Sequence, residues 1–418
     1  MRFNHVTCPH CGLLCDDLSI EVNGASLKLA SKAYPNCLKA FEDASFTTKR
    51  LPSPKVAGKK ASLDAAIKKA AKLLAASSQP LISGLITDIQ GCREAVLLAE
   101  KSKAVIDHAN GKGMQANLAV MQRYGKVKTT LSEVRNRSDL VIIFGSQIFN
   151  RFPRLSDRVL FPKTSLGNEG TINKQIIVID SSQAAKGSIP KRKGITYCPL
   201  EADSLDDIIH EFLQVVNLDS KRSNGNNLTN KLLEIKSTIL QKQYTTIVWN
   251  TGLFNSASAE QTTQSLTFAM KSLMEDVRCV GLPLGGSKAE ITANQVSTWS
   301  MGVPLPVAFM GGIPEHDPVI YNGENMLQNG EADTLVWLST YSPDDLPPKT
   351  DARTIVIGHP KMKVPSSVDV FIPVGIPGVD HSGLACRTDS VATLPLQKIR
   401  DINLPASSKV LKQIADLV

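Results

Sequence analysis

Short apolar runs alternate with amphipathic, helix-like stretches over most of this chain. After Ser62, apolar residues recur every three or four positions, which predicts a helix with Ser62 as its N-cap. The apolar runs further along the chain are typical of buried parallel strands. We place strands at residues 80–86, 104–107, 139–144, 175–179, 246–250, 277–281, 334–339, 354–358 and 368–373, with helices such as 257–270 between them. This alternation predicts a doubly wound α/β architecture, in which ligands bind beyond the carboxyl ends of the strands.

Two stretches interrupt the alternation and predict domain boundaries. Residues 51–54, Leu-Pro-Ser-Pro, separate a cysteine-rich lobe, residues 1–55, from a first α/β lobe, residues 56–216. The polar, turn-rich residues 217–230 are interpreted as an exposed linker to a second α/β lobe with a C-terminal tail, residues 231–418. The predicted fold class is therefore α/β, with a small cysteine-rich lobe followed by two doubly wound, Rossmann-like lobes.

Four cysteines near the N-terminus could supply one metal centre with four thiolates. Cys8, Cys11 and Cys15 share a short loop, and Cys37 follows a strand-like stretch and a turn, which gives the spacing Cys-x2-Cys-x3-Cys-x21-Cys. Four thiolates suit either a 4Fe-4S cluster or tetrahedral zinc. Two disulfides or free thiols are the alternative, which a reducing compartment disfavours. The other cysteines stand singly among apolar neighbours, as small core residues do: Cys92, Cys198, Cys279 and Cys386.

The N-terminus lacks the apolar segment of an export signal, and no apolar run approaches the roughly 18 residues that span a bilayer. We therefore expect a cytoplasmic protein that makes no membrane contact. With 418 residues, 42% of them hydrophobic, the chain is long enough to form two or three cores.

The basic residues are numerous but dispersed. The net charge of +8 would suit nucleic acid, yet no aromatic platform accompanies the lysines and arginines, so we expect no nucleic-acid binding. Lys191, Arg192 and Lys193 form a local cluster, and Lys288 ends the glycine-rich turn 281–288. These positions are candidates for contact with an anionic ligand or an acidic subunit, and ordinary solubility charge is the alternative. The sequence has neither a Gly-x-Gly-x-x-Gly fingerprint nor a P-loop, which argues against a nicotinamide or nucleoside-triphosphate enzyme.

Several segments together resemble the B subunit of formylmethanofuran dehydrogenase, a member of the molybdopterin oxidoreductases. The cysteine opening at residues 8–18, Cys-Pro-His-Cys-Gly-Leu-Leu-Cys-Asp-Asp-Leu, is the most specific of them. Residues 132–139, 298–304 and 378–389 resemble later segments of the family. The resemblance spans nearly the whole chain and implies a molybdopterin-oxidoreductase-like fold, here without the C-terminal β-barrel of many relatives.

One departure from the family pattern bears directly on function. In the dehydrogenase, a cysteine followed by histidine ligates tungsten or molybdenum carried by a pterin, shortly before the segment that residues 132–139 resemble. Here no cysteine occurs from Arg93 to Tyr197, and the corresponding residues 111–116 read Gly-Lys-Gly-Met-Gln-Ala. A later family motif with arginine and histidine is replaced by residues 285–289. The resemblance thus implies that the metal-pterin cofactor is absent and that the chain has no catalytic residue for the oxidoreductase reaction.

This pattern is most similar to the B subunit of the formyltransferase/hydrolase complex of methylotrophic bacteria. The resemblance implies a non-catalytic scaffold subunit in tetrahydromethanopterin- and methanofuran-linked one-carbon metabolism, from formaldehyde to formate. The implied partners are amidohydrolase-like, formyltransferase and glutamate-synthase-like subunits, and a methanofuran-type cofactor with a glutamate-rich tail. Inheritance favours a 4Fe-4S cluster at the four cysteines, whereas loss of the redox centre favours zinc or an empty site. The alternative is a true tungsten or molybdenum formylmethanofuran dehydrogenase subunit with an unusual metal ligand.

Overall fold

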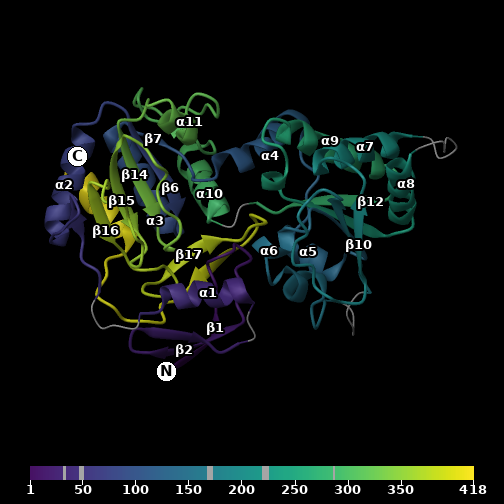
Figure 1. Cartoon of the computed structure of the whole chain (residues 1–418), viewed down its shortest axis with the longest axis horizontal. Helices are drawn as coiled ribbons and strands as arrows, with labels where there is room; N and C mark the ends of the chain where they lie inside the picture. Colours follow the sequence, from purple (N-terminus) through teal and green to yellow (C-terminus); the bar gives the residue numbers. More distant parts are fainter. Residues whose placement is uncertain (32–33, 47–50, 167–172, 219–225, 286–287) are drawn as a thin grey trace. The chain divides into compact units, whose positions relative to one another are not determined.

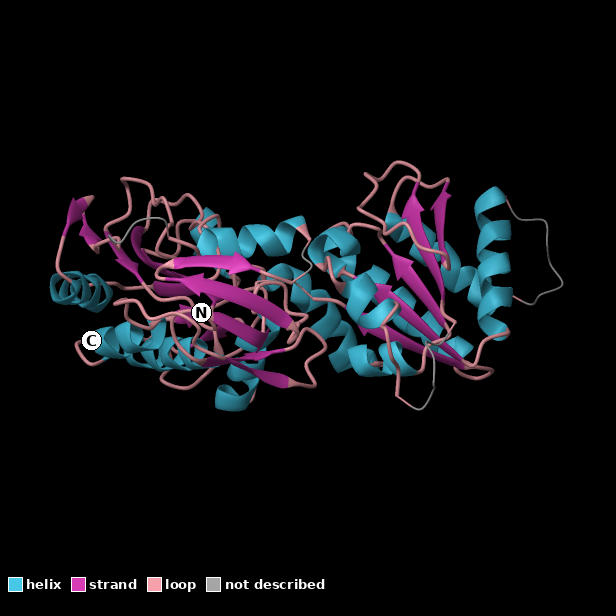
Figure 2. Ribbon diagram, turned by 90° about the horizontal axis from the view of Figure 1, so that it is seen from below, coloured by secondary structure: helices cyan, strands magenta, loops and turns pink. Residues whose placement is uncertain are grey.

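Each of the two compact units of the chain is built around one β-sheet, and the central strands of both sheets run parallel (Figure 1). The computed structural model describes residues 1–31, 34–46, 51–166, 173–218, 226–285 and 288–418. Unit 1 combines Met1–Gly111 with Ser287–Val418, and unit 2 comprises Lys112–Gly286. Figure 2 shows the strands of each unit gathered into a sheet with helices beside it. None of the helices in the described part of the chain is long and apolar enough to cross a lipid bilayer.

The sheet of unit 1 has eight strands in the order β13-β7-β6-β14-β15-β16-β4-β5. Its five central strands run parallel: β7 (Val105–Ile106), β6 (Pro80–Ile86), β14 (Thr334–Ser339), β15 (Arg353–Gly358) and β16 (Val370–Pro373). Antiparallel strands close both edges: β13 (Val307–Ala308) on one side, and the hairpin of β4 (Lys55–Val56) and β5 (Lys59–Lys60) on the other. Counted along the chain, the parallel strands follow the doubly wound order 2-1-3-4-5. The winding direction therefore reverses between β6 and β14.

Helices cover the sheet of unit 1 because alternate strand residues point to opposite faces. On one face, Ile82 and Val336 share a core with helices α2 (Leu63–Ala75), α3 (Ile89–Ser102), α10 (Glu290–Met301) and α12 (Ser407–Ala415). On the other face, Leu81 and Leu335 pack with α11 (Gly323–Gln328) and the segments around it. The predicted N-cap of α2 is confirmed, because the Ser62 hydroxyl accepts a hydrogen bond from the backbone N–H of Ala65.

The sheet of unit 2 consists of five parallel strands in the order β10-β9-β8-β11-β12. The strands are β8 (Leu140–Phe144), β9 (Gln175–Ser181), β10 (Ile195–Leu200), β11 (Tyr244–Trp249) and β12 (Arg278–Pro283). Counted along the chain, they follow the order 3-2-1-4-5 of dinucleotide-binding folds. The helical segments are α4 (Gly111–Tyr124), α5 (Leu131–Asn136), α6 (Ile148–Arg151), a π-helix (Ser156–Leu160), α7 (Leu205–Asn217), α8 (Asn227–Leu240), a 3₁₀ turn (Thr251–Leu253) and α9 (Ala259–Leu273).

The cysteine lobe is part of unit 1 and shares its core. It contains an antiparallel sheet of β1 (Arg2–Val6), β2 (Leu18–Asn23) and β3 (Ser26–Leu29), followed by α1 (Pro35–Ala44). Cys8, Ile20 and Phe41 from this lobe pack against Ile86, Tyr341 and Ile376 of the α/β body. Another small hairpin, β17 (Gly383–Cys386) with β18 (Thr393–Leu396), lies in the same unit. The lobe is too small to bury enough apolar surface alone, so it completes its core on the larger body.

The prediction of an α/β fold with parallel sheets is confirmed, and each strand placed from the sequence corresponds to an observed strand. The division into consecutive lobes, residues 1–55, 56–216 and 231–418, differs from the observed units. The reason is strand pairing across the expected boundary: β6 pairs with β14, and β8 pairs with β11. Of the expected linker, residues 219–225 lie outside the described residues, and Asn227–Asn230 already form the first turn of α8.

Candidate functional site

The first three cysteines lie on one tight loop of the N-terminal lobe. The backbone N–H of Cys8 donates to the carbonyl of Cys15 at 2.9 Å, which closes the loop. Inside it, Gly12 and Leu14 adopt positive φ angles of 75° and 48°. Glycine tolerates this left-handed conformation, whereas leucine reaches it only with strain. The backbone N–H of Thr388 donates to the Gly12 carbonyl at 2.8 Å, so the segment after β17 holds the loop from outside.

In the folded chain, Cys11, Cys15 and Cys37 each act electrostatically on the thiol of Cys8. Burial raises the pKa of the Cys8 thiol well above its usual range, and Cys11, Cys15 and Cys37 raise it further. Burial likewise raises the pKa of Cys11 to about 12, with added contributions from Cys15 and Cys37. The cysteines are not joined by disulfides. Among the described residues, no three His, Cys, Asp or Glu side chains converge closely enough to coordinate an ion.

A buried arginine ties the helix that carries Cys37 to the body of unit 1. Nη1 of Arg400 donates to the carbonyl of Ala44, at the end of α1, at 2.6 Å and to the carbonyl of Ala25 at 2.8 Å. Its Nε donates to Oδ1 of Asp380 at 2.7 Å, and both charged side chains are almost fully buried. Removing one partner of such a buried pair costs roughly 3–5 kcal/mol, because the other charge remains buried. Arg400 therefore fixes the position of α1, and with it Cys37.

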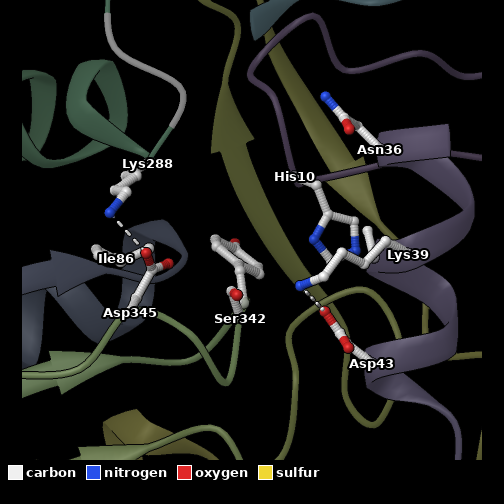
Figure 3. A pocket seen from close by; sticks show the side chains of 10 residues that line it. His10, Asn36, Lys39, Asp43, Ile86, Lys288, Ser342 and Asp345 are labelled. Atoms are coloured by element: carbon white, nitrogen blue, oxygen red, sulfur yellow. Dashed lines mark hydrogen bonds and ion pairs between the residues drawn. The ribbon is translucent and has the colours of Figure 1, made fainter. Parts of the chain in front are cut away.

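A pocket of about 220 Å³ lies beside this lobe, within unit 1 (Figure 3). Ile86 is the last residue of β6, and Tyr341 follows β14, so these two residues place the pocket beyond the carboxyl ends of both strands. Its remaining walls come from the cysteine loop, α1 and two segments of the body: His10, Asn36, Lys39, Ala40, Asp43, Lys288, Ser342 and Asp345. Because the winding reverses between β6 and β14, the pocket occupies the switch point where doubly wound sheets usually bind ligands.

Two buried polar atoms at the pocket lack hydrogen-bond partners among the described residues: Nε2 of His10 and the hydroxyl of Tyr341. The two rings meet edge to face with their centroids 6.0 Å apart. Burial lowers the pKa of His10 to about 4 and raises that of Tyr341, so both side chains are uncharged at neutral pH. An unpaired buried polar group costs roughly 1–3 kcal/mol. A polar ligand in the pocket would relieve this cost by pairing with them.

The lysines of the pocket already have carboxylate partners. Nζ of Lys288 lies 2.6 Å from Oδ1 of Asp345, and Nζ of Lys39 lies 3.1 Å from Oδ2 of Asp43, as Figure 3 shows. Lys39 also forms an ion pair with Asp344. Lysine charge at the pocket is thus largely neutralised, and an anionic ligand would have to compete with these carboxylates.

The basic cluster at residues 191–193 lies on unit 2, whereas Lys288 lies on unit 1. Lys191 and Lys193 are exposed. The guanidinium of Arg192 contacts Asp157 at 2.9 Å and lies 5.5 Å from the ring centre of Phe161. Of the turn that precedes Lys288, residues 286 and 287 lie outside the described part of the chain.

Sequence reasoning missed three pocket residues: His10, Tyr341 and Asp345. His10 stands inside the Cys-Pro-His-Cys run, and Tyr341 and Asp345 follow an apolar strand. The rule that ligands bind at carboxyl ends of strands could have selected Tyr341, but it does not say which strands are neighbours. The pairing of β6 with β14, which the sequence does not reveal, supplies that information.

No protein-family profile matches this chain. Two curated relatives are the B subunits of tungsten-containing formylmethanofuran dehydrogenase 2 from Methanococcus maripaludis and Methanocaldococcus jannaschii. Each is 26% identical over 409 residues, which cover 95% of this chain and 94% or 93% of the relative, respectively. A third relative is the B subunit of the formyltransferase/hydrolase complex of Methylorubrum extorquens, 26% identical over 330 residues, which cover 78% of this chain and 86% of the relative.

Among solved structures, this chain is similar to a chain in the crystal structure of the formyltransferase/hydrolase complex from Methylorubrum extorquens, which was determined with methylofuran. The TM-score is 0.72 and the sequence identity 23%, and the match covers 87% of this chain and 98% of the other. This likeness establishes a common fold. The sequence relatives confirm the resemblance found in the sequence: over most of its length, the chain is similar to the B subunits of formylmethanofuran dehydrogenase and of the formyltransferase/hydrolase complex.

Proposed function

We propose that this chain is a non-catalytic scaffold subunit of a formyltransferase/hydrolase complex in one-carbon metabolism. Its partners would be the amidohydrolase-like, formyltransferase and glutamate-synthase-like subunits that perform the chemistry. The homology to the B subunit of such a complex supports this assignment. The common fold with a chain of the complex from Methylorubrum extorquens is consistent with it.

One observation carries the choice of scaffold over enzyme: no cysteine occurs from Arg93 to Tyr197. The family resemblance assigns the thiolate ligand of tungsten or molybdenum to this interval. Residues 111–116, where the ligand is expected, begin helix α4 with the sequence Gly-Lys-Gly-Met-Gln-Ala. Glycine and methionine there cannot replace a thiolate, so oxidation of a formyl group would lack its metal ligand.

Cys8, Cys11, Cys15 and Cys37 would hold a 4Fe-4S cluster or, alternatively, zinc. The donor set matches either group in the number and type of its ligands, since both take four sulfur ligands. The raised pKa values mean that a bound cation must displace protons from these thiols, so metal affinity would fall with decreasing pH. In a scaffold, the bound group would stabilise the lobe rather than transfer electrons.

Metal and cofactor analysis of the purified full-length protein tests this function. We expect no tungsten, molybdenum or pterin and no oxidation of formate or formylmethanofuran with artificial electron acceptors. Visible absorption together with iron and zinc content would identify the group at the cysteines. Stoichiometric tungsten or molybdenum with bound pterin would instead establish the alternative, a formylmethanofuran dehydrogenase like the two archaeal relatives.

We further propose that basic residues of this chain retain the glutamate-rich tail of a methanofuran-type cofactor. Lysine suits such a mobile anion, because its flexible ammonium group does not require one bidentate geometry. Exposed Lys191 and Lys193 are better candidates than Lys288, whose ammonium group contacts Asp345.

Reversing all three charges at residues 191–193 to glutamate should weaken coupled formyl transfer by the assembled complex. The loss should be larger at low salt, where screening is least. Lys55→Glu/Lys59→Glu/Lys60→Glu, at exposed positions of the β4–β5 hairpin, is the matched control, because it also reverses three charges. Equal turnover of the triple variant and the parent at every salt concentration would assign the cluster to ordinary solubility charge.

A further inference from the structure

The loop after β13 displays large aliphatic side chains to solvent. Between residues 309 and 321, the exposed fractions are 46% for Met310, 65% for Ile313, 76% for Val319 and 62% for Ile320. Scattered exposed apolar residues are normal on protein surfaces, but several within one short loop indicate a surface that another molecule covers.

This loop is held in place by its own hydrogen bonds. Ala308 and Glu315 exchange backbone hydrogen bonds of 2.8 and 2.9 Å, which extend the edge of the sheet of unit 1. The Asp317 carboxylate accepts from the backbone N–H groups of Val319 and Ile320 at 2.8 and 2.9 Å. The backbone that carries these aliphatic side chains is therefore already ordered. Little conformational entropy of the loop would be lost when a partner binds to it.

The segment of the chain that carries this loop also differs in charge from the rest of the sequence. The protein has 47 Lys and Arg residues, yet none lies between residues 289 and 348. In the loop and in helix α11 directly after it, Glu315 and Glu324 are exposed acidic residues and Asp317 is a half-buried one. An otherwise basic protein thus presents an apolar surface on an acidic segment.

We propose that residues 309–321 form the docking surface for another subunit of the complex, one whose own contact face is apolar with a rim of Lys and Arg. This inference rests on the proposed function. The acidic character selects against other partners. Nucleic acid and anionic membranes would be repelled, and a symmetric contact between two copies would place the same acidic residues against each other.

Association of the full-length protein with its co-produced partner subunits tests the proposal. Ile313→Lys and Val319→Lys should each lower the yield of assembled complex by roughly tenfold or more, because a buried lysine would replace an apolar contact. Leu97→Lys is the matched control, since Leu97 on α3 is 47% exposed. Thermal unfolding of each isolated variant should match the parent, because these side chains contribute little to the core.

A charge variant tests the chemistry assigned to the partner. Glu324→Lys, at an exposed position of helix α11 directly after the loop, should slow association, and more at low salt than at high salt. If the parent protein assembles and all of these variants assemble equally well, the docking surface is wrong and the scaffold function stands. If the parent protein joins no complex, both proposals fail. A dimer of the isolated chain that Ile313→Lys disrupts would overturn the choice of a different subunit as partner.

Discussion

At the candidate site, burial shifts the pKa values of His10, Cys8 and Cys11 more than neighbouring charges do. Burial keeps His10 uncharged and the thiols of Cys8 and Cys11 protonated at neutral pH. Bonds from four thiolates to a metal ion would offset the cost of burying their negative charge. Small cysteine-rich lobes therefore often depend on a metal for folding.

The proposed metal site predicts that Cys11→Ser and Cys37→Ser lose iron or zinc and become less soluble, without a change in the chemistry of the proposed partner subunits. A structural metal contributes on the order of 10 kcal/mol to the folding of a small domain. Cys198→Ser is the control, because Cys198 lies in β10 of unit 2. Metal content and solubility are the measurements. Unchanged values in Cys11→Ser would show that the site is vestigial.

Asp107 at the end of β7 should make stability depend on pH. Burial raises its pKa from 3.8 to about 7, while its oxygens accept backbone hydrogen bonds from His108 and Gly323. Between pH 3.8 and about 7 the folded state binds the proton more tightly than the unfolded state, so this group's contribution to stability is lost as pH rises.

Asp107→Asn should consequently gain stability relative to the parent as pH rises, with the largest difference above pH 7. The asparagine amide oxygen can still accept one of the backbone hydrogen bonds, and its amide group has no charge to bury. Urea unfolding on the acidic and the alkaline side of that pKa measures the difference. A difference that is the same under both conditions would contradict the assignment.

Among the helices and strands, the choice of strand neighbours decides where functional side chains meet. β6 and β14 are far apart in sequence, yet they pair in parallel, which brings Ile86 and Tyr341 to one pocket. Local signals govern where elements begin. Ser62 caps α2, and Ser204 with Asp207 forms a complete capping box at the start of α7.

Ser62→Ala should destabilise unit 1 by about 1 kcal/mol, because it removes the acceptor for the Ala65 backbone N–H. Ser62→Asp should retain most of that stability, since the aspartate carboxylate can accept the same hydrogen bond and interacts favourably with the helix dipole. Chemical unfolding of the three proteins gives the comparison. An equal loss of stability in both variants would show that the effect does not arise from the N-cap hydrogen bond.

At the scale of the whole molecule, unit 2 is formed by one continuous segment of the chain, whereas unit 1 is formed by two. All strands of unit 2 come from one segment, Lys112–Gly286, whereas the sheet of unit 1 joins strands from before and after that segment. Unit 2 can therefore complete its sheet without the rest of the chain, and the N-terminal part of unit 1 cannot.

A fragment of residues 112–286 should fold cooperatively, while a fragment of residues 1–111 should remain unfolded or aggregate. In the shorter fragment, β6 lacks β14 and β7 lacks β13, which leaves apolar strands with unpaired edges. Circular dichroism and thermal unfolding of the purified fragments distinguish the outcomes. A cooperative transition in fragment 1–111 would show that the long-range pairing is dispensable.

The elements, the parallel α/β character and the family resemblance all follow from patterns that are local in the chain. Apolar runs identify buried strands because burial on both faces removes polar positions, and the spacing of Cys8, Cys11, Cys15 and Cys37 is short enough to be recognised directly. The capping role of Ser62 is local in the same sense.

The assembly of unit 1 from two separate segments of the chain and the position of the pocket become visible only in the folded chain. Strand pairing depends on contacts between distant segments. The hydrophobic pattern of the sequence identifies the strands but does not show which of them are neighbours in the sheet. A discontinuous unit 1 therefore replaces the expected lobe boundaries. For the same reason, His10, Tyr341 and Lys288 meet at one pocket although they are far apart in sequence.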